Sequence, residues 1–213
     1  MPRKKSQPKT DEKDVQQPPE EEQTKTDQES ALAGLLDNLE GPTMRSMALF
    51  GEIEEEKAAD ICVGLLMLSK KSDQELEPIN FYISTYGGNA DDMFSIYDMM
   101  NVAKRNCEVH TYGLGKVMSA GVLILANGTP GKRYVGRHCR VMIHSCNAGS
   151  VGDIHNLKNE MSQIQHQQDE YINALVSASS MTKRQLTRLL DRKVNVYLTA
   201  EEAIEYGIAD QIM

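Results

Sequence analysis

The 213-residue sequence lacks tryptophan and any long hydrophobic run. Its most apolar stretch, GVLILANGT, is interrupted after a few positions, whereas a membrane-spanning helix needs about 20 apolar residues in a row. No apolar segment follows the basic start, MPRKKSQPKTDEK, so no secretory signal is expected. These absences exclude an integral membrane protein and predict a cytoplasmic location.

Cysteine is scarce, and its spacing fits neither a disulfide framework nor a zinc site. Four cysteines lie apart, without a CxxC or Cys/His pattern: Cys62, Cys107, Cys139 and Cys146. We therefore expect reduced thiols and no bound metal. Positive charge is also limited, because 23 basic residues against 31 acidic ones give a net charge of -8. This balance weighs against nucleic acid as a partner.

The N-terminal segment, residues 1–40, differs in composition from the rest of the chain. From Pro2 to Ser30 the only large aliphatic residue is Val15, and prolines stand among Lys, Glu, Gln and Asp. Such a segment cannot bury enough apolar surface to offset its ordering entropy. We therefore expect a disordered acidic tail over residues 1–40 and a folded domain over residues 41–213. The sequence ALAGLLDNLE at the end of the tail fits contact with a partner or with the domain itself.

Strand-like and helix-like segments alternate from Met44 onward. The patterns predict strands at residues 46–53, 78–85, 107–115 and 139–145, and helices at residues 55–71, 90–105 and from Ser119 onward. Near the C-terminus, Thr199 and Glu202 form a capping box, Gly207 ends a helix and a short apolar strand follows. This alternation predicts an α/β domain of repeated ββα or βαβ units whose strand ends face a common site.

A long polar helix with a narrow apolar stripe is expected after residue 153. The stripe positions are spaced by three and four residues: Ile154, Leu157, Met161, Ile164, Gln168, Tyr171 and Leu175. So narrow a stripe suits a helix that projects from the domain and packs on a partner's copy of itself. A surface helix packed on its own core is the alternative.

Polar residues at the ends of expected elements form a candidate catalytic group. Ser119 opens a helix, His144 ends a strand, and Asn195 and Asp191 precede the last capping box. A serine becomes nucleophilic only with a base within hydrogen-bond reach, which His144 can supply. The base in turn needs an acceptor that orients its other ring nitrogen.

Glycines near this group fit the same chemistry. Acyl transfer passes through an oxyanion that backbone N–H groups stabilise, and the pair Gly87 and Gly88 lets the backbone turn without side-chain obstruction. The N–H groups of Gly88 and Ala120 are the candidate donors, and the small residues around Ser119 fit a backbone that lines an oxyanion hole.

Each feature also has an ordinary alternative. Ser119 alone fits a helix N-cap, His144 alone fits a hydrogen-bonded strand end, and Gly87 with Gly88 alone fits a turn. Lys116 permits a Ser-Lys dyad, although a lysine three residues away is poorly placed to receive the proton.

Four segments carry a resemblance to a known family. STYGGNADDMFSIYDMM, GLGKVMSAGVLILANGTPGKRYV, RVMIHS and YLTAEEAIEYGIADQIM have the order and spacing found in ClpP, the proteolytic subunit family of the Clp protease. The sequence is identified as a member of this family over residues 44–213. The resemblance implies a crotonase-like α/β fold, a spiral of repeated ββα units with a projecting handle helix, and the apolar stripe falls where the handle would be.

The resemblance also implies an assembly and an activity. Family members form two stacked seven-membered rings around a chamber and degrade unfolded polypeptides delivered by a hexameric AAA+ unfoldase; the peptidase itself needs no cofactor. The family's serine and histidine match Ser119 and His144, and its oxyanion donors match Gly88 and Ala120. The segment that pairs with bound peptide as a strand matches Asn147, Ala148 and Gly149 within SCNAGSVGD.

Several positions depart from the family pattern. Asn195 stands where the family usually has Asp; its oxygen can orient the histidine but lacks the charge that stabilises an imidazolium, so slow cleavage is expected. Asp191 would replace that carboxylate only after a shift of about one helical turn. Tyr86 stands where a proline usually precedes the glycine pair, and the long acidic tail is suited to a propeptide, a pore plug or a docking segment.

Three functional hypotheses follow. The first is a ClpP-like serine endopeptidase in a homo-oligomeric chamber, working with an AAA+ Clp unfoldase. The second, favoured by Asn195 and the altered peptide-binding segment, is a weakly active or inactive ring subunit that co-assembles with an active ClpP and modulates it. The third is an acyl-CoA hydratase or thioesterase of the crotonase type, which is disfavoured because that chemistry uses acidic residues and only Asp91 and Asp92 lie near the glycine pair.

Overall fold

The computed structural model of the protein describes residues 44–70 and 76–213. Residues 45–213 form one compact unit. The expected disordered tail, residues 1–40, lies outside the described residues. No helix in the described part of the chain is long and apolar enough to cross a membrane.

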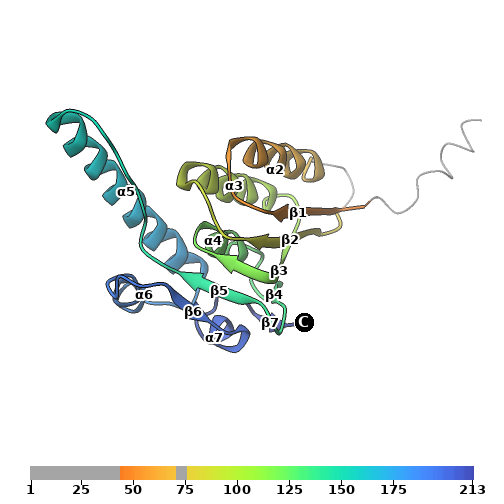
Figure 1. Cartoon of the computed structure of the whole chain (residues 1–213). Helices are drawn as coiled ribbons and strands as arrows, with labels where there is room; N and C mark the ends of the chain where they lie inside the picture. Colours follow the sequence, from red (N-terminus) through yellow and green to blue (C-terminus); the bar gives the residue numbers. More distant parts are fainter. Residues whose placement is uncertain (1–43, 71–75) are drawn as a thin grey trace, which may run out of the picture. The chain divides into compact units, whose positions relative to one another are not determined.

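Seven strands of the described residues form one sheet (Figure 1). They are β1 (Ser46–Phe50), β2 (Ile79–Thr85), β3 (Val109–Met118), β4 (Arg133–Val135), β5 (Arg140–Ile143), β6 (Val196–Leu198) and β7 (Gln211–Ile212). The order β1-β2-β3-β4-β7 is parallel throughout. β5 pairs in parallel with the end of β3 and antiparallel with β6. The domain is therefore α/β, as expected from the alternation of segments.

The repeated ββα unit is visible in how β3 divides. Its first part, residues 111–113, pairs with β4, whereas residues 116–118 pair with β5. The register with β2 shifts between these parts, where Gly115 adopts a φ of +62° that favours glycine. In the two preceding units, which begin with β1 and β2, the second strand is reduced to one residue each: Ile53 and Gly88, which form an isolated parallel bridge. Each unit thus contributes a long strand, a short second strand and then a helix.

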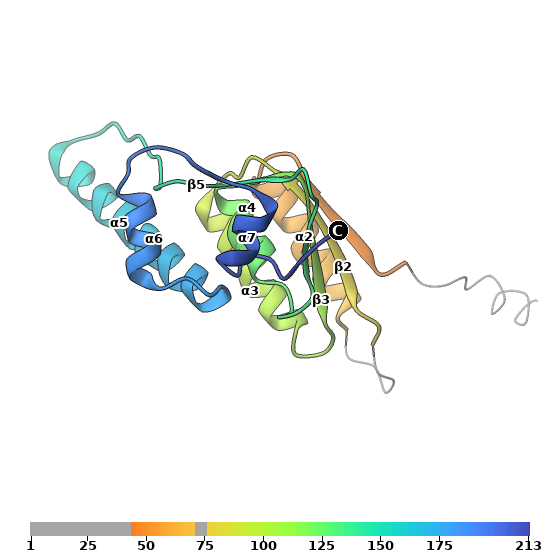
Figure 2. The ribbon, with the colours of Figure 1, turned by 90° about the horizontal axis from the view of Figure 1, so that it is seen from below.

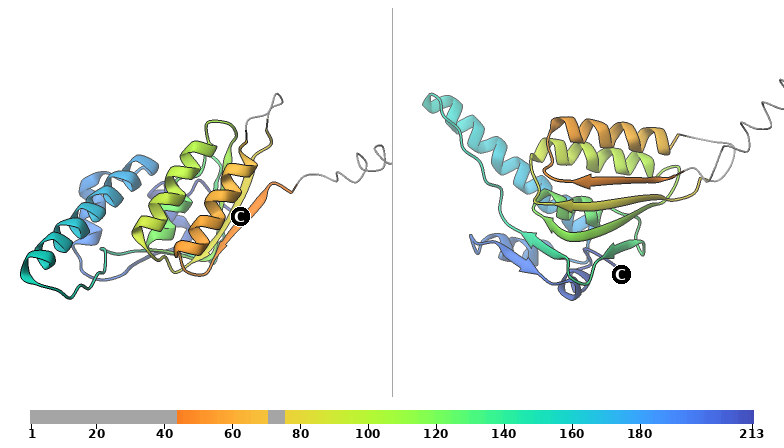
Figure 3. Two further views of the ribbon diagram at one scale, coloured as in Figure 1. Left: turned by 90° about the horizontal axis from the view of Figure 1, so that it is seen from above. Right: turned by 45° about the vertical axis from the view of Figure 1, so that its right-hand side comes forward.

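Two amphipathic helices pack side by side on one face of the sheet (Figure 3). α2 (Glu55–Leu68) buries Ala58, Ile61 and Leu65, and α3 (Ala90–Ala103) buries Met93, Ile96, Met100 and Ala103. This spacing of three and four places each set on a single helical face. α4 (Ala120–Ala126) is buried at every position, which explains its unbroken apolar sequence AGVLILA.

The long helix α5 (Ile154–Ala178) projects from the rest of the domain (Figure 1). Its C-terminal half packs on the core through Tyr171, Ile172 and Leu175. The apolar stripe of its N-terminal half is instead solvent-exposed, and Met161 is 67% exposed. The expected projecting helix is therefore present, and half of its stripe lacks a partner within the described part of the chain.

The C-terminal elements complete the sheet edge. α6 (Lys183–Leu190) lies beside α5 (Figure 2), and α7 (Ala200–Glu205) follows β6. The Thr199–Glu202 capping box, the helix stop at Gly207 and the final short strand are confirmed. The sequence interpretation missed α6, although Thr182 and Gln185 form a second capping box at its start.

The strand expected at residues 107–115 ends three residues too early in the prediction, since β3 extends to Met118. The sequence interpretation also missed β4 and β6. β3 continues through the glycine-rich GLGKVM segment to Met118, because Gly115 absorbs the irregularity and Val117 is fully buried. Ser119 therefore follows a strand directly and not a glycine-rich turn. β4 and β6 are each three residues long, too short to show a reliable alternation.

Candidate active site

Three of the candidate residues follow the short second strands of successive ββα units. Gly88 makes the bridge of the second unit, Ser119 comes directly after β3, and His144 comes directly after β5. β3 pairs in parallel with β2 up to Thr85 and with β5 at its own end, so the carboxyl ends of these three strands meet at one edge of the sheet. The topology alone thus brings the glycine pair, the serine and the histidine together.

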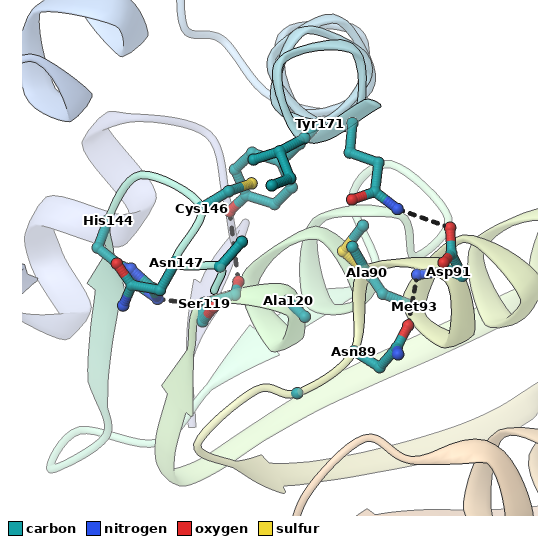
Figure 4. A pocket seen from close by; sticks show the side chains of 14 residues that line it. Asn89, Ala90, Asp91, Met93, Ser119, Ala120, His144, Cys146, Asn147 and Tyr171 are labelled. Carbon is teal, nitrogen blue, oxygen red and sulfur yellow. Dashed lines mark hydrogen bonds between the residues drawn. The ribbon is translucent and has the colours of Figure 1, made fainter. Parts of the chain in front are cut away.

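Ser119 and His144 are joined by a hydrogen bond of 2.8 Å between Oγ and Nε2 (Figure 4). Ser119 occupies the N-cap position of α4, but its side chain makes no capping hydrogen bond. The ordinary alternative, an N-cap serine, therefore does not account for its side chain. The backbone of Ser119 has a φ of +55° and a ψ of -123°, a strained conformation for a residue other than glycine.

The strained backbone of Ser119 is held at both of its polar groups. Its N–H donates to the carbonyl oxygen of Met142 at 2.8 Å. Its carbonyl oxygen accepts from the N–H of Val122 at 3.0 Å and from the hydroxyl of Tyr171 at 3.3 Å. The helix α5 thereby contacts the candidate nucleophile, which local sequence patterns around Ser119 could not indicate.

Replacing Tyr171 by phenylalanine is expected to lower the free energy of unfolding by about 1 kcal/mol at neutral pH, because the hydrogen bond to Ser119 is lost. Burial, and secondarily the nearby Cys146, raise the pKa of Tyr171, so the folded state keeps the phenol protonated. An unfolded tyrosine ionises above about pH 10, so this stabilisation is fully present below that pH and is lost progressively as the pH rises from there toward the raised pKa of the folded state. Denaturant titrations from pH 7 to 11 should show the advantage of the wild type shrinking. Tyr197→Phe, at an exposed strand position, is the control and should change little.

The glycine pair lies against Ser119. The N–H of Gly87 donates to Thr85 Oγ1 at 2.9 Å, and a Cβ at Gly87 would stand 2.6 Å from the Ser119 Cβ. On the other side, the carbonyl oxygen of Gly87 accepts from the N–H of Ile53, and the N–H of Asn89 donates to the carbonyl oxygen of Ile53, which follows β1. In a parallel bridge the N–H of the intervening residue, Gly88, faces the opposite side, toward the neighbouring strand β3 and Ser119.

Alanine at Gly88 is expected to destabilise the protein strongly, since its Cβ would clash with the backbone of Ile53. Gly131 is the matched control: its φ of +82° also favours glycine, but nothing lies within 4 Å of an added Cβ. Gly88→Ala should cost about 1–3 kcal/mol more than Gly131→Ala, the typical penalty of forcing atoms into an occupied space. Equal midpoints in chemical denaturation of the two variants would contradict this packing.

A cavity of about 330 Å³ opens beside Ser119. Its lining includes the candidate residues Gly88, Ser119, Ala120, His144, Asn147 and Ala148, together with Tyr171, Ile164 and Gln167 from α5. Ala120 begins α4, so its N–H belongs to the first turn that has no partner within the helix. The N–H of Gly88 and the first turn of α4 thus adjoin one space.

The expected substrate-binding strand does not form in the described part of the chain, although two of its residues line the cavity. Asn147, Ala148 and Gly149 form no strand; they are exposed, and Gly149 does not line the cavity. Lys116 places its ammonium 4.5 Å above the ring centre of Tyr86, so it is engaged away from Ser119 and the Ser-Lys alternative gains no support. Cys146 lines the cavity, but burial raises the pKa of its thiol, which keeps it protonated and poorly nucleophilic at neutral pH.

Asn195 is the residue directly before β6, the strand that pairs with β5. The register Ile143↔Val196, extended by one residue, sets Asn195 opposite His144. Asn195 is exposed, however, and the hydrogen bonds of residues 44–70 and 76–213 include none between it and His144. Asp191 caps α6 and has no recorded bond to His144 either. The fold thus brings position 195 beside the histidine without an orienting bond.

Comparison with known proteins identifies the family. The family model described as Clp protease matches residues 20–213. The chain belongs to the Clp protease family. This match extends the resemblance, noted over residues 44–213, into the N-terminal segment, and it fits the α/β domain with a projecting helix.

Named relatives of this Clp protease family member cover most of its length. The chain is similar to ATP-dependent Clp protease proteolytic subunit 2 of Corynebacterium efficiens, with 32% identity over 169 residues, 79% of this chain and 82% of that protein. It is 31% identical to proteolytic subunit 1 of Corynebacterium jeikeium over 79% of this chain and 87% of that protein. It is also 30% identical to proteolytic subunit 2 of Rhodococcus jostii over 86% of this chain and 93% of that protein.

Proposed function

We propose that this protein is a serine endopeptidase subunit of the Clp type, which cleaves unfolded polypeptides. The observation that carries the proposal is the 2.8 Å hydrogen bond between Ser119 Oγ and His144 Nε2, made by a serine at a helix start that does not cap the helix. The family match and the names of the relatives, proteolytic subunits of an ATP-dependent protease, support the same activity. The match also favours this activity over crotonase-type acyl-CoA chemistry.

In the proposed mechanism, Ser119 Oγ attacks the carbonyl carbon of the scissile peptide bond while His144 Nε2 takes the hydroxyl proton. The carbonyl π electrons move onto oxygen, and the N–H groups of Gly88 and Ala120 stabilise the resulting oxyanion. As the tetrahedral intermediate collapses, the carbon–nitrogen bond breaks and His144 gives its proton to the leaving amine. A water molecule, deprotonated by His144, then hydrolyses the acyl-enzyme and releases Ser119.

The mechanism also requires that the imidazole ring of His144 be held in the right orientation. For Nε2 to accept the serine proton, the other ring nitrogen must carry a proton and should donate it to an acceptor. We assign that acceptor role to the side-chain oxygen of Asn195, because the β5–β6 register, extended by one residue, sets Asn195 opposite His144. A neutral amide orients the ring but stabilises the imidazolium less than a carboxylate does.

Substrate binding and assembly follow the family pattern in this proposal. The exposed backbone at Asn147, Ala148 and Gly149, of which the first two residues line the cavity, would pair with an extended peptide as an added strand. The exposed stripe of α5 would pack against its copy in a facing ring, giving two stacked seven-membered rings. A hexameric AAA+ Clp unfoldase would deliver substrates, and hydrolysis itself would use no metal or cofactor.

Labelling with a fluorophosphonate, read by intact mass, tests the proposed activity. The probe phosphonylates activated serines, so the full-length, assembled protein should gain one adduct per chain. Peptide mapping should place the adduct at Ser119, and His144→Ala should abolish labelling although Ser119 is intact. Absence of an adduct on the assembled wild type would overturn the proposal.

A second function, a non-catalytic ring subunit, is favoured by the exposed, unbonded position of Asn195. Such a subunit would join an active ClpP and alter its gating or its choice of partner. Native mass spectrometry of a mixture with an active proteolytic subunit tests this alternative. Mixed oligomers without fluorophosphonate labelling of this chain would support it, and separate homo-oligomers would exclude it.

A further inference from the structure

The cavity beside Ser119 has apolar walls that continue away from the serine. Ala120, next to Ser119, and Met93, near the start of α3, contribute to these walls (Figure 4). Ile164 and Tyr171 contribute to its lining from α5. A substrate carbonyl held over Ser119 carries the P1 side chain on the adjacent carbon, which places the P1 side chain within reach of this cavity.

The far end of the cavity is acidic. Asp91, in the first turn of α3, lines it at the opposite end from His144 (Figure 4). Gln167 Nε2 donates to Asp91 Oδ1 at 2.8 Å, which connects α5 to α3 and fixes the direction of the carboxylate. This bond leaves Oδ2 of Asp91 without a recorded side-chain partner among the described residues.

No cation neutralises this carboxylate within the cavity. The residues lining the cavity include neither lysine nor arginine, and the ion pairs of the described residues do not involve Asp91. Gln167 donates a hydrogen bond but carries no charge. Asp91 is exposed, so a cationic group that reaches this end of the cavity would meet a solvated carboxylate with no cationic partner in the described part of the chain, to which it can donate charge-assisted hydrogen bonds.

We infer that this cavity is a P1 specificity pocket selecting arginine and lysine, with Asp91 as its specificity-determining residue. The apolar walls accept the methylene stem of a long basic side chain, and Asp91 accepts hydrogen bonds from its head. Arginine, lysine and leucine side chains all bury a similar apolar stem in this pocket. Arginine and lysine should therefore bind more tightly than leucine only because their charged head groups contact the carboxylate of Asp91. The inference rests on the proposed peptidase function and adds its substrate class.

A purely structural role for Asp91 makes a different prediction. An acidic residue in the first turn stabilises a helix through the macrodipole, and Asp92 is equally placed in that turn. Asp92 does not line the cavity. Burial, and secondarily the charge of Asp92, raise the pKa of Cys62 on α2, so Asp92 lies near the neighbouring helix. Asp92→Asn therefore removes the same charge from the same turn without altering the pocket, and is a matched control for Asp91→Asn.

Cleavage of fluorogenic peptides that differ only in an arginine, lysine or leucine at P1 tests the inference. The wild type should prefer the basic peptides in kcat/KM. The ratio of arginine to leucine cleavage should fall by about 10- to 100-fold in Asp91→Asn, the typical worth of a hydrogen bond to a charged group. Asp92→Asn should keep the wild-type ratio. A wild-type preference for leucine, or equal ratios in the two variants, would overturn the inference.

Binding to Ser119→Ala separates this inference from the proposed catalysis. Product peptides ending in arginine or leucine occupy the same pocket and need no nucleophile. Calorimetry on the assembled Ser119→Ala protein should show tighter binding of the arginine peptide, and that preference should disappear when Asp91→Asn is added. If fluorophosphonate labelling fails but this preference is present, the peptidase proposal falls and the pocket for basic side chains stands. Equal binding of both peptides would reject the pocket even in an active enzyme.

Discussion

Replacing Ser119 by alanine is expected to abolish peptide hydrolysis and fluorophosphonate labelling. The substitution removes Oγ, and with it the attacking atom and the hydrogen bond to His144. Loss of the nucleophile in a serine peptidase lowers kcat by roughly 10⁶-fold. Because Oγ makes no capping hydrogen bond to α4, the fold should be retained, and the melting temperature of the variant should stay close to that of the wild type.

A neighbouring serine provides the control for Ser119→Ala. Ser145 follows the histidine but does not line the cavity, so Ser145→Ala should keep both labelling and turnover. Wild-type rates in Ser119→Ala would show that another residue carries the reaction. Cys146, which lines the same cavity, would be the first residue to test, although burial raises the pKa of its thiol and makes it a poor nucleophile at neutral pH.

The proximity of Gly88, Ser119 and His144 could be predicted from the sequence because each lies at the carboxyl end of a strand. The end of a parallel strand is a local feature, and the rule that such ends share one edge makes them neighbours. The sequence interpretation thus chose chain positions that the fold brings together even where it assigned the wrong boundary, ending β3 at Gly115 although the strand continues to Met118. The helix start after Ser119 was visible, whereas its positive φ was not.

The outer wall of the site could not be predicted in the same way. Tyr171 and Gln167 reach the cavity from α5, about one ββα unit later in the chain, and their spacing marks only one face of a helix. The two halves of the apolar stripe on α5 have different surroundings. The C-terminal half packs on the core and contacts Ser119, whereas the N-terminal half is exposed. The periodicity of the apolar residues cannot show which of them pack inside the domain and which are left for a partner, because this depends on where the sheet ends.

Replacing Asn195 by aspartate is expected to accelerate acylation of Ser119. Aspartate has the size of asparagine, so the change adds charge at a position that the β5–β6 register sets opposite His144. A carboxylate there fixes the histidine tautomer and stabilises the imidazolium formed when Oγ loses its proton; the reverse substitution in serine peptidases costs roughly 10⁴-fold in kcat. We expect a gain of about 10- to 100-fold in the labelling rate, smaller because the exposed loop must order around the new contact.

Asp191→Asn is the control, since Asp191 is the other carboxylate that could orient His144. It caps α6 and is exposed, so its loss should leave the labelling rate unchanged. A large loss of rate in Asp191→Asn would mean that the 191–195 loop rearranges and that Asp191 is the third member of the group. An unchanged rate in Asn195→Asp, with normal labelling of the wild type, would mean that the neutral orienter does not limit acylation. The exposed conformation of Asn195 would then be sufficient for activity, and the departure from the family's Asp would carry no catalytic cost.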